Sequence, residues 1–388
     1  MKNVSPDFRR MLLATLFFGA VSGIFMSTLN NYLSEVQGFD AGHRGWLEFP
    51  RELPGFLIFM VMGLLLTRLR ETRIAALAMV ATAAGALGLG FLAPNMVLLV
   101  AWIVIWSLGD HIIFAVEGPL GLKLAKVGGE GRRLGQLGGA RNLGVILGVS
   151  CVWLLARLVG DRYDLFYLVG GVCAAAAGYF YFRLGLDRDS PPSHRLVYKP
   201  RYKIFYAISA LFGIRKQIFL VFGTWVLVDL HSVPVSTIAL LYFLASLIGV
   251  VMRPLLGDVI DWLGERTVLA ADEVLLIVVC LVYAFASRIL DAPHDLYLLY
   301  GAYMLDHVLF ALRVARTTYL KKIAETPADI TPTISLGITI DHAVAMTLPV
   351  LSGIIWERFG HEFVFLLAAA VAVVGFFICL QIKVPVED

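Results

Sequence analysis

Charged residues are scarce in this sequence. Of its 388 residues, 16% are charged and 59% are hydrophobic, whereas roughly a quarter of the residues of an ordinary soluble domain are charged. A composition this poor in charge excludes an ordinary soluble fold. The net charge of +3 gives no support to a nucleic-acid-binding surface, because so little of the chain is polar enough to lie outside a membrane. We therefore expect no nucleic-acid partner.

Cysteines and cofactor motifs are also scarce. The four cysteines, Cys151, Cys173, Cys280 and Cys379, lie in apolar stretches without the spacing of a metal site. We interpret them as small packing residues and expect no disulfide bonds. The sequence has neither a glycine-rich nucleotide loop nor an HExxH zinc motif. These absences argue against ATP-driven transport and against an intramembrane metalloenzyme, so we expect no enzymatic activity and no cofactor.

Long apolar runs are abundant. A run of about 20 residues crosses a hydrocarbon core of roughly 30 Å, and the chain contains about twelve such runs. They cover residues 11–33, 46–67, 73–93, 97–119, 134–157, 164–186, 208–231, 235–256, 267–288, 296–318, 332–354 and 362–382. The first run is too long for a signal peptide and is interpreted as a retained helix. The sequence predicts an all-α integral membrane protein with twelve transmembrane helices, which we expect to be a monomer.

The basic residues are concentrated in alternate loops. Because lysine and arginine accumulate in cytoplasmic loops, the richer set of loops predicts the cytoplasmic side. That set contains Arg68, Arg70, Arg73, Lys123, Lys126, Arg132, Arg133, Arg188, Arg195, Lys199, Arg201, Lys203, Lys321 and Lys322. The opposite loops contain Arg44, Arg157, Arg162, Arg288 and Arg358. We expect both termini in the cytoplasm and the protein in the plasma (inner) membrane.

A polar segment rich in proline and charge divides the predicted helices six and six. It runs from Leu186 to Lys203 and is interpreted as a cytoplasmic linker. We therefore predict an N-terminal six-helix bundle over residues 1–186, a linker over 187–207 and a C-terminal bundle over 208–388. The stretch KIFYAISALFGIRKQ is compatible with an interfacial helix, and a long continuous helix is the equal alternative.

Two similar segments suggest an internal repeat. GLLLTRLRETR starts at Gly63 and GDVIDWLGERT starts at Gly257, and the difference, 257 minus 63, is 194, half of 388. At the same offset Glu71 falls on Glu265. Because many transporters are built from repeats, the sequence favours one six-helix unit used twice.

The second of these segments resembles the loop signature of the major facilitator superfamily. The signature has a Gly, an Asp four residues later, then a Gly and an Arg, matched by Gly257, Asp261, Gly264 and Arg266. The resemblance covers essentially the whole chain, and it implies two pseudo-symmetric six-helix bundles and solute transport by alternating access.

In that family the loop helps to lock helices in one gating state. The resemblance therefore implies a gating role for Asp261 and Arg266, and for Gly63 and Arg68 of the first copy. The first copy departs from the signature, because Thr67 stands in the place of the Asp and Arg70 in the place of the second Gly.

Charged residues recur inside the apolar runs. Asp110-His111 and Asp306-His307 both begin the pattern Asp-His-x-x-Phe-Ala, and 306 minus 110 is 196, close to the repeat offset. Seven residues after each Asp comes a charge, Glu117 or Arg313. Seven residues is close to two helical turns, so each Asp shares a helix face with that later charge.

Further polar residues lie at comparable depth, namely Asp341 with His342, and Arg141 with Asn142, while Asn30 lies near the outer end of the first helix. Each intramembrane charge costs roughly 2.5–3.5 kcal/mol on insertion scales. Together the six charged side chains would cost on the order of 18 kcal/mol in lipid, more than the roughly 5–15 kcal/mol that stabilises a typical protein. These six are Asp110, Glu117, Arg141, Asp306, Arg313 and Asp341. They must therefore face one another or water. In the superfamily's arrangement the first, fourth, seventh and tenth helices line a central cavity.

The charge balance of this set suggests its chemistry. Four carboxylates and two guanidiniums leave an excess of about two negative charges, which a water-poor cavity tolerates badly. Protons or another cation would compensate it, since histidine titrates near neutral pH. The predicted coupling residues are Asp110, His111, Asp306, His307, Asp341 and His342. The predicted substrate-binding residues are Arg141, Asn142, Arg313, Glu117 and Asn30.

The sequence thus predicts a secondary transporter of a small molecule or ion, coupled to protons or another cation. One alternative makes Asp110, His111, Asp306 and His307 ligands of a divalent metal that is itself the substrate. Another alternative is a transporter-like sensor that moves nothing. A third possibility at the residue level is that these side chains form a static polar network, with Glu117 paired to Arg313.

Overall fold

The computed structural model describes residues 5–125, 129–186 and 198–383. In this part of the chain all regular structure is helical, and twelve helical segments are long and apolar enough to cross a membrane. The prediction of an all-α membrane protein with twelve spans is therefore confirmed. Most of the predicted linker, residues 187–197, lies outside the described residues.

The chain divides into two compact units. Unit 1 contains Met1–Tyr32, Pro50–Pro192 and Pro234–Ser246, and unit 2 contains Leu33–Phe49, Ser193–Val233 and Leu247–Asp388. The helices of unit 1 are α1 (Pro6–Asn31), α3 (Ile58–Arg68), α4 (Glu71–Phe91), α5 (Met96–Lys123), α6 (Glu130–Val159) and α7 (Tyr163–Phe182). Two helices, α2 (Ala41–Phe56) and α9 (Val235–Leu263), contribute residues to both units.

The helices of unit 2 follow the linker. They are η2 (Pro200–Tyr202), α8 (Lys203–Gln217), η3 (Ile218–Gly223), η4 (Val226–Leu230), α10 (Glu265–Ile289), α11 (His294–Phe310), η5 (Ala311–Arg313), α12 (Val314–Ile323), α13 (Pro327–Phe359) and α14 (His361–Cys379). The remaining short element, η1 (Tyr32–Val36), extends α1 by a π-helical turn.

Helix ends follow ordinary local chemistry. The Ser5 Oγ accepts a hydrogen bond from the backbone N–H of Phe8 at 3.2 Å and caps α1, and the Asn95 side chain caps α5 in the same way. Gly264 separates α9 from α10 with a φ of +78°, a conformation that is easy for glycine alone.

The seventh span begins before residue 208, so the predicted boundary at that residue is wrong. Helix α8 begins at Lys203 and continues without a break through the π-helical turns of η3 and η4 to Leu230. The structure therefore has the continuous helix and not a separate interfacial one. The physical reason is that nothing in residues 203–217 breaks a helix, and Arg215 and Lys216 near its end find carboxylate partners, as described below.

The predicted loops around the two repeated segments are shorter than expected. Gly63 lies inside α3, and Gly257 and Asp261 lie inside α9, so that Gly264 makes the turn to α10 by itself. These segments contain no proline, and a single glycine inside a helix lowers stability without ending it.

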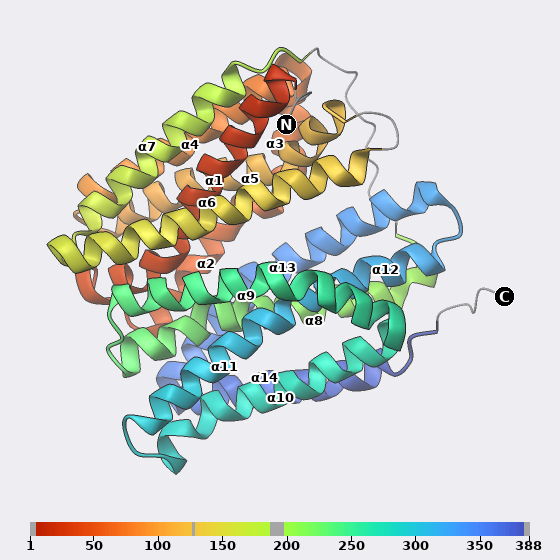
Figure 1. Ribbon diagram of the computed structural model, residues 1–388. Coiled ribbons are helices and arrows are strands. Elements are labelled where there is room, and N and C mark those ends of the chain that lie inside the picture. Colours follow the sequence, from red (N-terminus) through yellow and green to blue (C-terminus); the bar gives the residue numbers. More distant parts are fainter. Residues whose placement is uncertain (1–4, 126–128, 187–197, 384–388) are drawn as a thin grey trace. The chain divides into compact units, whose positions relative to one another are not determined.

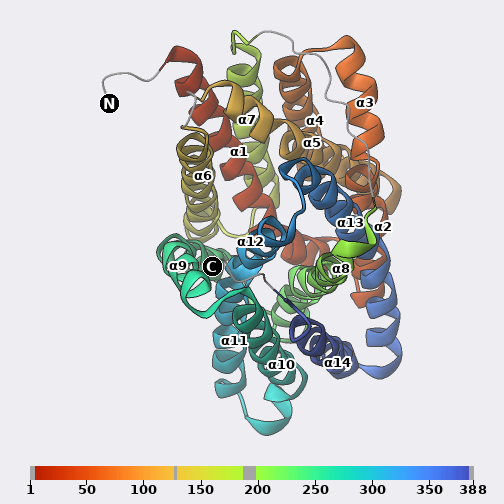
Figure 2. The ribbon, with the colours of Figure 1, turned by 90° about the vertical axis from the view of Figure 1, so that its right-hand side faces the viewer.

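Within unit 1 the main helix pairs are α1 with α6, α4 with α7, α4 with α5 and α1 with α7 (Figure 1). Within unit 2 they are α8 with α13, α10 with α14 and α10 with α11 (Figure 2). When the spans are numbered within each unit, three pairs occur in both units: the first span packs on the fifth, the third on the sixth, and the third on the fourth. Apolar side chains of α1, α4, α5 and α7, such as Met11, Met79 and Ile113, form a continuous core in unit 1.

Glycines set the distance between α1 and α6. A Cβ atom on Gly19 would overlap the carbonyl oxygen of Arg141, and one on Gly144 would overlap that of Leu16. Gly23 and Gly148 make similarly close approaches to backbone. The two helices therefore pack closely through small residues.

Candidate functional site

Asp110 lies near the middle of α5, deep in the fourth span. Its side chain is buried, with 7% of the residue surface exposed. Its Oδ1 atom has no hydrogen-bond partner among the residues that the structure describes. A buried carboxylate without a full set of partners is costly when ionised, so Asp110 is a candidate functional group of unit 1.

His111, the neighbour of Asp110, is held in one orientation. Its Nδ1 lies 2.8 Å from the carbonyl oxygen of Ser107, and because a carbonyl only accepts, Nδ1 carries the proton of this hydrogen bond. Its Nε2 lies 3.8 Å from an oxygen of Glu52. The Ser107 hydroxyl also donates to the carbonyl oxygen of Arg51 at 2.5 Å.

Glu52 adds a carboxylate that the predicted site does not include. Its Oε1 accepts a hydrogen bond from Arg51 at 2.5 Å, so the second span supplies an ion pair next to the histidine of the fourth. The sequence suggests the Arg51–Glu52 pair by adjacency alone. It gives no sign that Glu52 approaches His111, because the two lie on different helices.

Glu117 and Arg141 form a salt bridge between α5 and α6. The Arg141 guanidinium also lies 4.9 Å from the ring centroid of Phe18 and 5.0 Å from that of Phe114. Asn142 is half-buried beside it on α6, and Asn30 is buried on α1. The structure thus pairs Glu117 with Arg141, whereas the static-network alternative from the sequence paired it with Arg313.

In unit 2 the carboxylate of Asp306 belongs to a buried triad. The Arg215 Nη1 donates to both oxygens of Asp272 at 2.8 and 2.7 Å, and the Arg215 Nη2 donates to Asp306 Oδ1 at 3.1 Å. All three residues are buried. One guanidinium between two carboxylates leaves a formal charge of minus one in this triad.

Sequence reasoning missed Arg215 and Asp272. One of its two equal alternatives placed Arg215 at the end of an interfacial helix, and it passed over Asp272 inside the ninth span. The available signal was that Asp272 is an intramembrane carboxylate, which by itself indicates function or a partner.

The remaining predicted coupling residues lie in the same unit. The Nδ1 of His307 lies 3.0 Å from the carbonyl oxygen of Tyr303, the same bond to the residue four positions earlier that His111 makes. Lys216 donates to Asp341 Oδ2 at 2.8 Å. His342 follows on α13 and is half-buried. Arg313 lies in η5 and is exposed, 5.2 Å from the ring centroid of Phe310.

The predicted gating residues lie at helix ends beside an ion pair found in both units. Glu71, at the start of α4, accepts from Lys123 at the end of α5 at 2.6 Å. Glu265, at the start of α10, pairs with Lys322 at the end of α12 at 2.8 Å. Arg68, Asp261 and Arg266 are exposed. The acidic residue that is paired at the α9–α10 turn is therefore Glu265 and not Asp261.

The end of the linker is tied to the turn between α12 and α13. Asp329 accepts hydrogen bonds from Lys199 at 2.6 Å and from the Tyr202 hydroxyl at 2.8 Å. These two bonds, the one from Lys199 first, hold the pKa of Asp329 below its usual range, and the same contact raises the pKa of Lys199. Tyr202 is fully buried, which fixes the start of the seventh span.

The fold and these buried charges define a multi-pass helical membrane protein whose spans carry ionisable groups. A sequence model of the Major Facilitator Superfamily matches residues 11–312. The chain belongs to this superfamily. Among the curated proteins compared by sequence, none matches the chain.

Solved structures of transporters share the fold. The nucleoside transporter NupG is 14% identical with a TM-score of 0.78, covering 97% of this chain and 99% of its own. A D-xylose-proton symporter is 15% identical with a TM-score of 0.71, covering 97% of both chains. A bacterial homologue of the iron transporter ferroportin is 13% identical with a TM-score of 0.75, covering 98% of this chain and 99% of its own. At these identities the likeness concerns the fold.

Proposed function

We propose that the protein is a secondary active transporter that moves a small solute by alternating access, driven by protons or another cation. This proposal depends on the environment of Asp110. Its carboxylate is buried near the middle of a span, and its Oδ1 has no partner among the described residues. Keeping it ionised at that depth costs roughly 2.5–3.5 kcal/mol on insertion scales. A bound proton removes this cost, so Asp110 is suited to take up and release one.

The triad of Arg215, Asp272 and Asp306 supports a second cation-binding position. Its three hydrogen-bonded charges sum to minus one, and a proton on either carboxylate makes the triad neutral. His111 and His307 accompany the two positions, and Asp341 and His342 complete the coupling set. The fold likeness to a D-xylose-proton symporter supports proton coupling as the first mechanism to test.

The substrate contacts in this proposal are Arg141, Asn142, Glu117, Arg313 and Asn30. The gating residues are Gly63, Arg68, Gly257, Asp261, Gly264 and Arg266. Nucleosides, D-xylose and peptides are named for proteins of the same fold, so these three solute classes form the first panel for flux measurements.

The test is transport in proteoliposomes under an imposed pH gradient. Asp110→Asn and Asp306→Asn each remove a proton-binding group, and we expect at least a tenfold loss of uphill accumulation with counterflow exchange retained. Asp161→Asn is the matched control, because Asp161 is exposed between α6 and α7. Unchanged pH-driven accumulation in both intramembrane variants would exclude the coupling role. Absence of flux for every solute would favour the non-transporting sensor.

One observation favours divalent metal ions as a second candidate substrate. His111 and His307 both bond a carbonyl oxygen through Nδ1, which favours the tautomer with the lone pair on Nε2, the form that ligates a metal through that nitrogen. The fold likeness to an iron transporter homologue points the same way. We expect Mn²⁺ or Zn²⁺ to raise the melting temperature in detergent, less in His111→Gln or His307→Gln but equally in His43→Gln, an exposed control. No metal effect on the wild type would contradict this candidate.

A further inference from the structure

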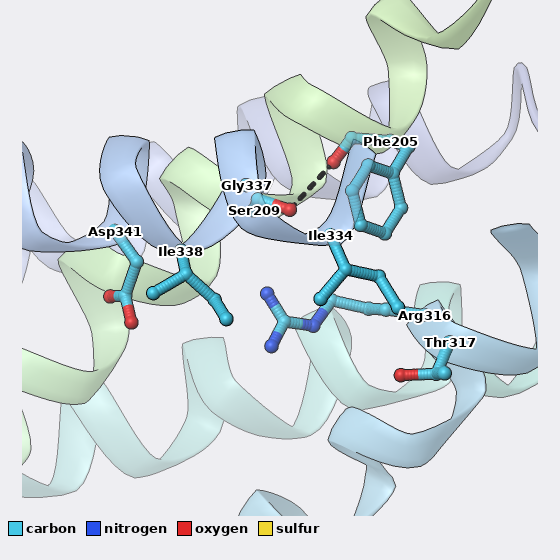
Figure 3. A pocket seen from close by; sticks show the side chains of 8 residues that line it. All are labelled: Phe205, Ser209, Arg316, Thr317, Ile334, Gly337, Ile338 and Asp341. Atoms are coloured by element: carbon cyan, nitrogen blue, oxygen red, sulfur yellow. Dashed lines mark hydrogen bonds between the residues drawn. The ribbon is translucent and has the colours of Figure 1, made fainter. Parts of the chain in front are cut away.

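A pocket in unit 2 combines polar and apolar walls. It lies between α8, α12 and α13 and has an empty volume of about 370 Å³ including its mouth (Figure 3). Phe205, Ile334 and Ile338 form apolar walls, and Ser209, Arg316 and Asp341 supply polar groups. The space inside it that can hold a water-sized molecule is about 70 Å³, well below the roughly 300–1,000 Å³ typical of drug-sized sites, so the pocket has room only for a small solute.

Arg316 is a cation that forms no ion pair within 4.0 Å in the part of the chain that the structure describes, and the charge of Asp341 in the same pocket acts on it only from a longer distance. It makes no hydrogen bond or ion pair with any residue that the structure describes, and its Nε is buried without a partner. Its guanidinium carbon lies 3.8 Å from the ring centroid of Phe212, which holds the group in place. In contrast, Arg215 in the same unit is bonded to two carboxylates. A guanidinium has five N–H donors, so Arg316 has unused capacity for an anion.

Asp341 supplies an unused acceptor on the other side of the pocket. Its Oδ2 accepts from Lys216 at 2.8 Å, whereas its Oδ1 is buried and has no partner among the described residues. In Figure 3 the Asp341 carboxylate and the Arg316 guanidinium flank Ile338. The two groups form no ion pair within 4.0 Å in the described chain, so the pocket presents an unmatched donor and an unmatched acceptor together.

We infer that this pocket binds a small organic anion, with its carboxylate or phosphate group on Arg316 and a hydroxyl or amine donating to Asp341. This inference rests on the proposed transport function and names its substrate class. The planar guanidinium matches carboxylate and phosphate oxygens in pairs. The apolar walls strengthen such a contact by limiting competition from water. Arg316, three residues beyond the predicted Arg313, is then a further substrate-binding arginine of the C-terminal unit.

The test is ligand-dependent thermal stabilisation of the full chain in detergent, at constant ionic strength. The probes are glycerate, glycerol 3-phosphate and serine, with glycerol as the neutral counterpart. We expect at least one anionic probe to stabilise the wild type and glycerol to have no effect. Arg316→Gln should weaken that binding by tenfold or more, the scale of a lost charge-assisted hydrogen bond. Arg358→Gln is the matched control, since Arg358 is exposed at the far end of α13.

Two further variants keep the inference testable if Arg316→Gln does not fold. Arg316→Lys keeps the charge but loses the planar pair of donors, and we expect an intermediate loss of affinity. Asp341→Asn should weaken glycerate several-fold and leave propionate, which has no hydroxyl, unchanged. Glycerate and glycerol 3-phosphate separate a carboxylate ligand from a phosphate ligand.

The outcomes separate this inference from the transport proposal. Equal affinity in the wild type and the Arg316 variants, or no stabilisation by any anionic probe, would overturn the inference. Anion binding without flux in proteoliposomes would keep the pocket assignment and overturn transport. Uphill flux of a neutral solute, with no anion binding, would keep the transport proposal and overturn the pocket assignment.

Discussion

At the scale of single residues, Arg215 is the most consequential side chain of unit 2. It separates the carboxylates of Asp272 and Asp306, and all three groups are buried. Without the guanidinium, two carboxylates would face each other in a medium that solvates neither. A group that neutralises two neighbours is therefore harder to replace than either neighbour alone.

We predict that Arg215→Met destabilises the protein by about 3–5 kcal/mol, the range measured when one partner of a buried ion pair is removed. Converting the whole triad to apolar residues, with Asp272→Leu and Asp306→Leu added, should restore most of this loss. The measurement is the apparent melting temperature in detergent. A triple variant no more stable than Arg215→Met would show that packing of the arginine stem, and not its charge, accounts for the loss.

The sequence predicts Asp306 but not its partners, and the reason is geometric. The two hydrogen-bonded neighbours of Arg215 lie 57 and 91 positions away, and helical periodicity relates only residues a few positions apart on one helix. Glu52 and His111 illustrate the same limit in unit 1. Residue type and depth identify a candidate group, whereas its counter-ion depends on which helices pack together.

At the scale of elements, the contact of α1 with α6 depends on glycine. Gly144 faces the backbone of Leu16 at a distance that leaves no room for a side chain, while Gly139, on the same helix, has nothing within 4 Å of a Cβ position. The two glycines therefore offer a matched pair of substitutions. One lies in a helix contact, and the other is exposed.

We predict that Gly144→Ala destabilises the protein by about 1–3 kcal/mol, because the added methyl group forces the helices apart. Gly139→Ala should be neutral or stabilising by up to about 1 kcal/mol, since alanine has the higher helix propensity. Melting temperatures of the two purified variants provide the check. Equal effects of both substitutions would mean that the close approach of α1 and α6 does not contribute to stability.

The number of membrane-spanning helices is the feature that the sequence predicts best. Twelve apolar runs translate into twelve candidate spans, because the length needed to cross a bilayer leaves little freedom. The ends of the helices are less predictable. The seventh span starts at Lys203, and α9 continues to Leu263. Both helices extend beyond the apolar runs, because polar side chains are tolerated at a helix end when they find partners or reach the lipid–water interface.

At the scale of the whole molecule, the internal repeat remains a prediction that several contacts support. Both units pair corresponding spans, and both join the start of the third span of the unit to the end of the fourth by a glutamate–lysine pair. Glu71 and Glu265 are separated by the offset of 194 that the sequence suggests (265 minus 71). The buried charged residues differ between the units, so a repeated helix arrangement does not imply the same ionisable residues in both halves.

The orientation of the whole chain is a further prediction, and it follows from the distribution of lysine and arginine. We expect Arg70 and Glu325 on the cytoplasmic side and Asp161 and Asp291 on the opposite side, because the loops that hold the first two are the basic ones. All four residues are exposed. In a cysteine-free background, each is replaced by cysteine and treated with a membrane-impermeant maleimide in intact cells and again after permeabilisation.

The labelling pattern decides between three topologies. Reaction of Asp161→Cys and Asp291→Cys in intact cells, with Arg70→Cys and Glu325→Cys reacting only after permeabilisation, corresponds to cytoplasmic termini. The inverse pattern would reverse the orientation and make the loop charges a poor guide for this chain. A pattern in which the two members of one pair differ would require an odd number of crossings between them. That result would contradict the twelve-span arrangement itself, since residues 161 and 291 are separated by four complete spans.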